Sequence, residues 1–317
     1  MKTRKLGNLE VTEIGMGCMG MSHAAGKAME IEDGARIVRA AYDMGYTFFD
    51  TAKNYGYVGD PNHNEKILGK ALAGIRDKVV ISSKTGVEFD YAVDPDVPPL
   101  LYDSSRESIR KSIEGSLKRL NTDYIDLYFQ ARIDPKVEPE EVAESMAELI
   151  REGKIRGWGI SEVSLDYLQR ANTVCPVTAV ENNYSIVNRV HEELIPFLEA
   201  HHIGWVAQGS LMKGLLTGAY KKGAQFARDD WRSRIVNDEN IDRYAPLISY
   251  LTRLGEEKGA TPGQIALAWI LHRKPYIVPI PGSTKPERLA ENMRAAEVIM
   301  GEDEMAEIDR IVEAVTV

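Results

Sequence analysis

The chain has 317 residues, 44% of them hydrophobic, and a formal net charge of −9 at pH 7. This length and apolar content allow one large core, so we expect a single domain over residues 1–317. The acidic balance argues against a nucleic-acid partner, which normally requires a basic patch. The two cysteines cannot form a disulfide framework, the charged segment 1–10 lacks the apolar core of a signal peptide, and no apolar run approaches the roughly 18 residues of a membrane span. These features predict a cytoplasmic protein without a membrane segment.

Strands and helices alternate along the sequence. A hairpin with Asn8 in its turn is expected over 5–11, and apolar strands are expected to begin near residues 14, 47, 79, 124, 155, 177, 203 and 276. The spacing of apolar residues predicts helices over 32–44, 65–73, 105–120, 138–151, 165–172, 190–200, 242–258, 262–272, 285–295 and 302–314. The proline-containing segment 86–103 and the polar segment 217–240 are predicted as loops, the second with some helix.

This alternation defines the fold class. Strands that alternate with helices pair in parallel, so the pattern predicts an α/β fold. Eight such units favour a closed (β/α)8 TIM barrel, preceded by the short hairpin and followed by an extra C-terminal helix. The alternative is an open, doubly wound sheet, but no Gly-x-Gly-x-x-Gly sequence follows the first strand. In a barrel the chemistry is located at the C-terminal ends of the strands.

Two of the predicted strands end in charged residues. One apolar run ends at Asp50 and is followed five residues later by Tyr55, and a second run ends at Lys84. At neighbouring strand ends these groups can form a proton-donating site, because an ammonium favours phenolate and a carboxylate keeps the ammonium charged. The alternative is three unrelated polar residues, and these segments alone do not separate the two interpretations.

Strand side chains alternate between faces, which predicts the lining of the barrel. If Asp50 and Lys84 point inward, Ala131 faces the same mouth and Arg132 faces the opposite way. Trp158 is expected to face the helices. The residues expected to point inward with this set are Phe48, Val80, Ser82, Ile125, Leu127 and Phe129.

A second candidate site is the stretch Gly282–Lys285, which follows the last strand and opens a helix. Backbone N–H groups, hydroxyl groups and cations in such a loop suit a phosphate. A capped helix with solvated charges is the alternative, and the strand-loop-helix context favours the phosphate site.

Several motifs, spread over nearly the whole chain, resemble those of one known family. They are Phe49–Ala52 with Tyr55–Gly56, His63–Leu72, Lys84, Leu117–Leu120 with Tyr124–Leu127, Gly153–Arg156, Gly159–Glu162 and Ile280–Asn292. On these residues the sequence resembles the aldo-keto reductases.

The resemblance implies an NADPH-dependent oxidoreductase that reduces a small-molecule aldehyde or ketone. Tyr55 would protonate the carbonyl oxygen, Lys84 would lower the phenol pKa, and Asp50 would pair with Lys84. The residues it assigns to the cofactor are Ser161, Glu181, Gln208, Ser210, Leu211, Lys213, Gly282, Ser283, Thr284, Lys285, Arg288, Glu291 and Asn292. Of these, Ser161 and Glu181 would hold the carboxamide, 208–214 the pyrophosphate, 283–285 with Arg288 the 2′-phosphate, and Asn292 the adenine. Lys285 with Arg288 indicates NADPH rather than NADH.

Several positions depart from the family pattern near the expected nicotinamide. Ala131 replaces a histidine that would donate to the carbonyl oxygen, and loss of one such donor costs on the order of 10²- to 10³-fold in rate. Glu181 replaces a glutamine, and Gln208–Ser210 replaces an aromatic residue followed by Ser-Pro. Lys53 and Asn183 stand where acids are common. Together these changes indicate an altered substrate, altered chemistry or a modified site.

Three functions are consistent with these motifs and departures. The first is an NADPH-dependent carbonyl reductase, weakened or redirected by Ala131. The second is an NADPH-holding barrel that reports the cofactor state to a partner and turns over little. The third is non-redox chemistry with Lys53 or Lys84 as a Schiff-base nucleophile. The six histidines show no metal-ligand spacing, so no metal is predicted.

Overall fold

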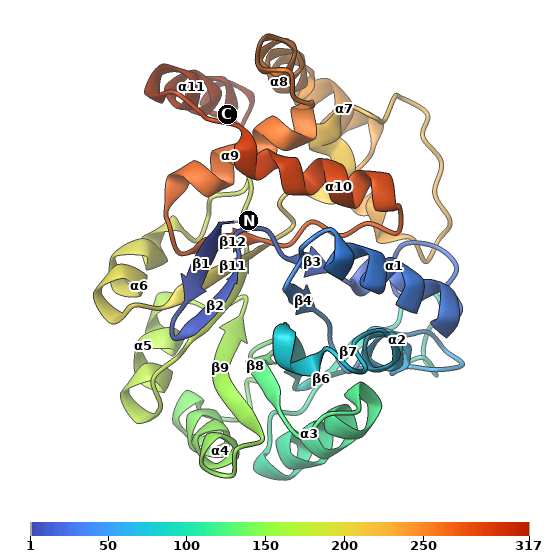
Figure 1. The fold of residues 1–317 in the computed structure, drawn as a ribbon, viewed down its shortest axis with the longest axis vertical. Coiled ribbons are helices and arrows are strands. Elements are labelled where there is room, and N and C mark those ends of the chain that lie inside the picture. Colours follow the sequence, from blue (N-terminus) through green and yellow to red (C-terminus); the bar gives the residue numbers. More distant parts are fainter. Residues whose placement is uncertain (1, 317) are drawn as a thin grey trace.

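Eight parallel strands form one curled sheet in the computed structural model, which describes residues 2–316 (Figure 1). In sequence order they are β3 (Met16–Gly17), β4 (Phe48–Asp50), β5 (Val80–Thr85), β8 (Ile125–Gln130), β9 (Ile155–Ser161), β10 (Ala179–Asn183), β11 (Gly204–Gln208) and β12 (Ile277–Pro279). Each strand pairs with the next one in this order. The two edge strands approach each other where the Gly15 N–H donates to the Pro279 carbonyl 2.9 Å away. The predicted α/β barrel is confirmed.

Helices surround the sheet and follow each of its strands (Figure 1). They are α1 (Ile31–Asp43), α2 (His63–Ala71), α3 (Arg106–Leu120), α4 (Pro139–Arg151), α5 (Leu165–Val174), α6 (Ile195–His201), α7 (Asp238–Arg243), α8 (Ala245–Lys258), α9 (Pro262–Arg273), α10 (Pro286–Arg294) and α11 (Glu302–Thr316). Most begin and end within a few residues of the prediction. The Ser105 side chain accepts the Ser108 N–H, which fixes the start of α3 as expected for an N-cap.

Two predicted helices are shorter than expected, and a proline explains each. The expected helix over 242–258 is divided at Tyr244 into α7 and α8. The expected helix over 190–200 is α-helical only from Ile195, after a short 3₁₀ turn. Pro196 and Pro246 lie in the first turns of α6 and α8, where a missing N–H and a fixed φ are tolerated, so each proline starts a new helix.

The segment 86–103 is not the irregular loop that its prolines predicted. It contains an antiparallel hairpin of β6 (Val87–Phe89) and β7 (Leu100–Tyr102), in which Phe89 pairs with Leu100. The prolines lie in the connection between the two strands, where no ladder hydrogen bond is required. The prediction for this segment was therefore wrong in its secondary structure.

Apolar side chains fill the inside of the barrel. The cluster contains Phe48, Leu127, Phe129, Ala179, Val206, Val278 and Ile280, with Val80 packed against it. The inward direction predicted for Phe48, Val80, Leu127 and Phe129 is confirmed. Ile125, at the start of β8, was assigned to the same face but packs with the outer core instead.

The N-terminal hairpin covers one end of this interior. Its strands β1 (Thr3–Leu6) and β2 (Leu9–Thr12) contribute Leu6, Leu9 and Val11 to the interior cluster. Gly7 in its turn has φ +58, and a Cβ there would lie 2.9 Å from Thr178, so glycine allows both the turn and the close approach. The predicted hairpin thus closes the barrel at the N-terminal ends of its strands.

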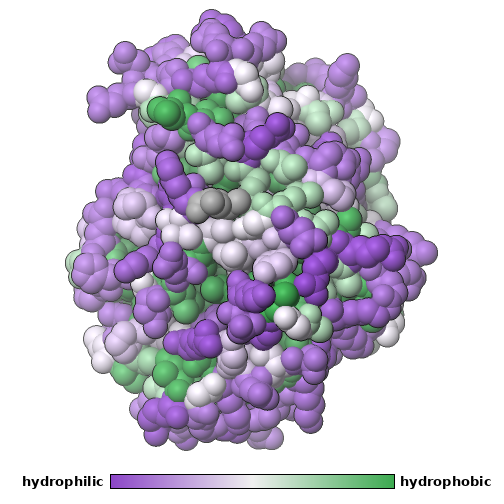
Figure 2. Space-filling model, viewed as in Figure 1, coloured by the Kyte–Doolittle hydropathy of each residue, from purple (hydrophilic) through white to green (hydrophobic). Residues whose placement is uncertain are grey.

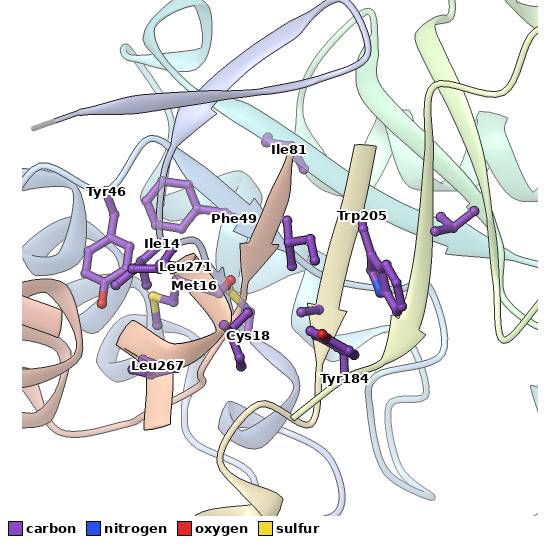
Figure 3. Close-up of a cluster of buried hydrophobic side chains, with 14 of the residues drawn as sticks. Ile14, Met16, Cys18, Tyr46, Phe49, Ile81, Tyr184, Trp205, Leu267 and Leu271 are labelled. Atoms are coloured by element: carbon purple, nitrogen blue, oxygen red, sulfur yellow. The ribbon is translucent and has the colours of Figure 1, made fainter. Parts of the chain in front are cut away.

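The larger core lies between the strands and the helices. Figure 3 shows Phe49 and Ile14 beside Leu271 of α9, and Ile81 and Trp205 on other strands of the same buried cluster. Trp158 is fully buried in this outer core, as its position in the strand predicted. The two cores together hold the strand ends in place.

The outside of the molecule is largely hydrophilic on the face in Figure 2, with hydrophobic residues in small scattered groups. The last helix, α11, packs beside α8 (Figure 1). Among the described residues, no helix combines the length and the apolar character that crossing a membrane requires.

Candidate active site

Three side chains at the C-terminal ends of β4 and β5 form what we call the proton-transfer corner: Asp50, Tyr55 and Lys84. Lys84 Nζ lies 2.5 Å from Asp50 Oδ1 and donates to the Thr51 carbonyl at 3.0 Å. Ser82 Oγ donates to the same Asp50 oxygen at 2.7 Å. Asp50 and Lys84 come together because β4 and β5 pair with Asp50 opposite Ser82, two residues before Lys84.

Tyr55 reaches this pair from the loop after β4. Lys84 Nζ lies 5.2 Å from the centroid of the Tyr55 ring. The Tyr55 carbonyl accepts Ser22 Oγ at 2.8 Å and the Asn64 N–H at 3.0 Å. A Cβ on Gly56 would lie 2.1 Å from the Asp60 carbonyl, so the loop can only fold back this tightly with glycine at that position. The loop therefore presents the phenol in a defined place.

Asn64 is the buried centre of this arrangement. Its side chain accepts Thr51 Oγ1 at 2.6 Å and donates to the Cys18 carbonyl at 2.9 Å and to Ser22 Oγ at 2.7 Å. It thus joins the ends of β3 and β4 to the Tyr55 loop. The family motif around Asn64 therefore has a structural basis that spacing alone does not reveal.

The next residue of that motif anchors the helix behind the corner. Glu65 on α2 is fully buried, and it accepts Ser83 Oγ at 2.6 Å and Arg119 Nε at 2.7 Å. Ser83 belongs to β5 and Arg119 to α3, so a single carboxylate ties one strand to two helices. A buried charge that is paired and hydrogen-bonded in this way is tolerated.

The pKa values of the corner reflect burial and charge together. The surrounding protein removes most water from the Tyr55 hydroxyl, which raises its pKa to about 12; Lys84 lowers it, while Asp50 and Glu181 raise it further. The lowering expected from Lys84 is present but smaller than the effect of burial. Burial opposes the Lys84 ammonium, but Asp50, Glu181 and Tyr55 outweigh it, so the pKa of Lys84 is raised.

A cavity of about 1040 Å³ opens at this end of the barrel. It is lined by Asp50, Tyr55 and Lys84 and by every residue that the resemblance assigned to a cofactor: Ser161, Glu181, Gln208, Ser210, Leu211, Lys213, Gly282, Ser283, Thr284, Lys285, Arg288, Glu291 and Asn292. These residues come from six strand ends and from α10, so only the folded barrel brings them together.

The far end of the cavity has the composition of a phosphate site. Ser283, Thr284 and Lys285 precede α10, and Arg288 lies in its first turn. Ser283 Oγ accepts the Lys285 N–H at 3.1 Å, which shapes the loop. A helix N-terminus with two cations and two hydroxyl groups provides donors and positive charge for a phosphate dianion.

Beside the corner lies a second group: Ala131, Arg132, Ser161, Glu162 and Glu181. We call it the carboxamide wall, after the cofactor group that the resemblance assigns to Ser161 and Glu181. Ala131, the first residue after β8, lines the cavity as predicted. Arg132 lines it as well, and its Nη1 donates to Ser161 Oγ at 3.2 Å. The prediction that Arg132 faces away was wrong, because β8 ends at Gln130 and side chains beyond a strand end no longer alternate.

Glu162 lines the cavity, although it was not among the site residues predicted from the sequence. It has φ +54, and its Oε1 accepts the Asn183 N–H at 3.1 Å and the Gln208 side-chain amide. His191 Nε2 lies 3.5 Å from its Oε2. Glu162 therefore joins the ends of β9, β10 and β11. The feature of the sequence that could have identified Glu162 as a site residue is its position directly after Ser161, at the end of a predicted strand.

Three rings that pack on one another, those of His23, Phe89 and Trp231, line one side of the cavity. His23 lies 4.7 Å from Phe89 and 5.0 Å from Trp231, measured between ring centroids. Phe89 comes from the β6–β7 hairpin and Trp231 from the long segment before α7. Arg228 of that segment pairs with Asp94 in the hairpin at 2.7 Å. Segments 86–103 and 217–240, which were both predicted as loops, therefore cover the site together.

Lys53 does not share this cavity. Its Nζ donates to Ser112 Oγ at 2.7 Å and pairs with Glu88, in a separate groove of about 580 Å³. Its position in the Tyr55 loop, where acids are common in the family, predicted a residue near the nicotinamide, but the structure directs its side chain toward α3.

Comparisons with known proteins agree with this geometry. The sequence model of the Aldo/keto reductase family matches residues 13–313. A probable aldo-keto reductase of Glycine max is 35% identical over 309 residues, which are 96% of this chain and 87% of that protein. A glycerol dehydrogenase of Gluconobacter oxydans has a similar structure, with a TM-score of 0.88, 27% identity, and coverage of 98% of this chain and 95% of that one. An aldo/keto reductase of Klebsiella pneumoniae, solved with NADP and acetate, has a TM-score of 0.76 and 24% identity, covering 98% of this chain and 96% of that one. The chain belongs to the aldo/keto reductase family.

Proposed function

We propose that the protein reduces an aldehyde or ketone to an alcohol with NADPH, and that Tyr55 donates the proton. The observation that carries this proposal is the position of Tyr55 beside the buried Asp50–Lys84 pair, in the same cavity as the phosphate-type loop before α10. A proton donor and a dinucleotide site in one cavity are what carbonyl reduction requires.

The residues of the cavity fit NADPH. The lining is continuous from Ser161 and Glu181, near the corner, to Arg288 and Asn292 on α10, so one extended molecule can contact both ends. Lys285 and Arg288 supply charge for a 2′-phosphate, which favours NADPH over NADH. When bound, NADPH supplies the hydride that the carbonyl carbon accepts.

The corner residues divide the proton transfer among them. A phenol with a pKa of about 12 is protonated at neutral pH, so Tyr55 holds a proton ready for the carbonyl oxygen. The Lys84 ammonium stabilises the phenolate that remains, and Asp50 keeps the ammonium charged and in place. Reduction is therefore favoured at neutral pH, whereas alcohol oxidation, which starts from phenolate, gains rate as the pH rises.

Lysine-based chemistry has less support. A Schiff-base nucleophile needs a neutral amine, but the pKa of Lys84 is raised by its carboxylate neighbours. Lys53 lies outside the cavity. Borohydride trapping of a carbonyl compound on either lysine in the absence of NADPH would overturn this ranking.

A cofactor-binding module with little turnover is the second candidate, because Ala131 cannot donate to the carbonyl oxygen. The two candidates are separated by measuring NADPH binding through its fluorescence and NADPH consumption with a panel of aldehydes and ketones. Binding with consumption supports the reductase, binding without consumption of any carbonyl supports the module, and absence of binding contradicts both.

The cofactor preference has its own test. Replacing Arg288 with alanine removes a charge-assisted bond of about 1.5–3 kcal/mol, so NADPH affinity is expected to fall roughly 10- to 100-fold while NADH affinity changes little. Arg294→Ala, at the other end of α10 and outside the cavity lining, is the matched control. An equal loss for both cofactors in Arg288→Ala contradicts a 2′-phosphate contact.

A further inference from the structure

Glu181 is a buried acid at a position where the family resemblance expects an amide. It lies in the middle of β10, directly opposite Ser161 of β9, and only 1% of its surface is exposed. Its side chain still lines the cavity. The acid therefore occupies the place from which the side chain would contact the nicotinamide carboxamide.

The Lys84 ammonium lies close to two carboxylates, those of Asp50 and Glu181. Lys84 Nζ lies 2.5 Å from Asp50 Oδ1 and 3.2 Å from Glu181 Oε2. Two of the three Lys84 N–H groups are directed to Asp50 and to the Thr51 carbonyl. Among the residues that the structure describes, the shared Lys84 ammonium is the only cation within 4 Å of Glu181 Oε2, and no other group donates to that oxygen. Asp50 has a second donor, Ser82 Oγ. Of the two acids, Asp50 is the better stabilised anion.

The surrounding charges favour a proton on Glu181. The groups that face it are Asp50 from β4, Tyr55 from the following loop, Lys84 from β5 and Arg132 from the end of β8. Burial and the Asp50 charge raise the pKa of Glu181 to about 8, although Lys84 and Arg132 lower it. A buried anion that shares its cation with a second carboxylate is more costly than the neutral acid, so protonation relieves the excess negative charge.

Glu162, the other acid of the carboxamide wall, differs from Glu181 in the direction of its pKa shift. Burial raises its pKa, but His191, Arg132 and the Asn183 N–H outweigh burial and lower it below the usual value. Glu162 is therefore an anion through the whole neutral range, while its neighbour across the wall is not.

We propose that Glu181 is a neutral carboxylic acid in the resting protein, and that NADP(H) binds to this form, with the carboxyl O–H donating to the carboxamide oxygen of the nicotinamide. The inference rests on the proposed function for the identity of the cofactor. A carboxylate can only accept hydrogen bonds, whereas a carboxamide offers both an acceptor and a donor group. The neutral acid restores the donor that glutamine would supply. Above the pKa of Glu181, each binding event takes up one proton from solvent.

The first test is the pH dependence of NADPH affinity, measured by fluorescence between pH 7 and 9.5. This range lies above the second phosphate pKa of about 6. If only the neutral acid binds, affinity is constant to about pH 8 and falls roughly 30-fold by pH 9.5, because the competent fraction falls by that factor. Glu181→Gln keeps the donor at every pH and removes this fall.

Glu162→Gln is the matched control, since it neutralises the other wall acid but leaves Glu181 titrating. It is expected to keep the wild-type pH slope, whatever its absolute affinity. Calorimetry at pH 8.5 in buffers of different ionisation enthalpy is expected to show proton uptake by the wild type and none by Glu181→Gln. A wild-type affinity that is constant to pH 9.5, or a Glu181→Gln variant that retains the fall, overturns the proposal.

A measurement without cofactor separates this inference from the proposed function. The infrared spectrum of the ligand-free wild type at pH 7 is expected to contain the carbonyl stretch of a neutral carboxyl group, which disappears in Glu181→Gln and at pH 9.5. If NADPH binds at no pH but the band is present, the proposed function fails and the protonation state of Glu181 stands. Absence of the band overturns the inference even if NADPH binds.

Discussion

The proton-transfer corner and the carboxamide wall differ in how firmly the fold holds their side chains. In the proton-transfer corner, Asp50 and Lys84 pair directly, and Asn64 ties the Tyr55 loop to two strand ends. In the carboxamide wall, Arg132 and Glu162 lie beyond strand ends and make polar contacts at the cavity edge. The corner is held by buried hydrogen bonds, whereas Arg132 and Glu162 of the wall are held by partly exposed polar contacts.

Three of the positions that depart from the family pattern according to the resemblance, Ala131, Glu181 and Gln208, line the cavity. At Asp50, Tyr55 and Lys84 the resemblance shows no departure. A substitution in the corner is expected to affect both stability and the proposed proton transfer, because the same hydrogen bonds serve both. A substitution of Arg132 or Glu162 in the wall is expected to change the surroundings of the proposed cofactor and substrate, with a smaller effect on stability. Four substitutions test this comparison.

The largest effect is expected for Tyr55→Phe, which removes the proposed proton donor of the corner. Carbonyl reduction is expected to fall by about 10²- to 10⁴-fold, the usual contribution of a general acid. NADPH affinity is expected to change little, as fluorescence titration will show. Tyr57→Phe, an exposed tyrosine two residues away, is the control. Activity that survives Tyr55→Phe unchanged excludes Tyr55 as the donor.

Lys84→Met is expected to lower the free energy of unfolding by about 3–5 kcal/mol, because it leaves Asp50 buried without its cation. Urea unfolding measures the loss. Lys66→Met, which breaks a half-exposed pair with Asp60, is expected to cost about 0.2–1 kcal/mol. Similar losses in the two variants contradict the buried, tightly held corner.

Ala131→His adds a donor to the wall near the carbonyl oxygen. We expect kcat/KM for aldehyde reduction to rise by roughly 10- to 100-fold, below the 10²- to 10³-fold that an optimally placed donor contributes. Ala131→Leu adds bulk without a donor and is expected to give no gain. If both variants lose activity alike, the space beside Ala131 is used by the substrate and not by a missing donor.

The smallest effect is expected for Glu162→Gln, in the wall. The Glu162–His191 pair is 3.5 Å long with 28% and 20% of the side chains exposed, so its loss is expected to cost about 0.2–1 kcal/mol at pH 7. Because the pKa of Glu162 is lowered by folding, its contribution is present above the usual glutamate pKa and is lost as the pH falls through the folded value. Urea unfolding at pH 7 and pH 4 is therefore expected to show a difference from wild type that shrinks in acid. A loss as large as that of Lys84→Met would erase the distinction between corner and wall.

Local pattern determined most of the architecture. Alternation of strands and helices predicted eight parallel strands, and the period of two along β4 and β8 predicted that Phe48 and Leu127 point inward. The prediction for Arg132 was wrong because alternation applies only within a strand, and β8 ends two residues earlier. The β6–β7 hairpin was missed because its strands are only three residues long and are separated by prolines.

The sequence by itself determined the barrel, the residues at its strand ends and the phosphate-type loop, because periodicity and turn chemistry are local properties of the chain. Only the tertiary structure decided the charge state of the site. Glu181 and Lys84 are 97 positions apart by their numbers, and they meet at 3.2 Å because intervening strands curl into a barrel. A pKa depends on burial and on charges within a few ångströms. Those distances exist only once the sheet has closed.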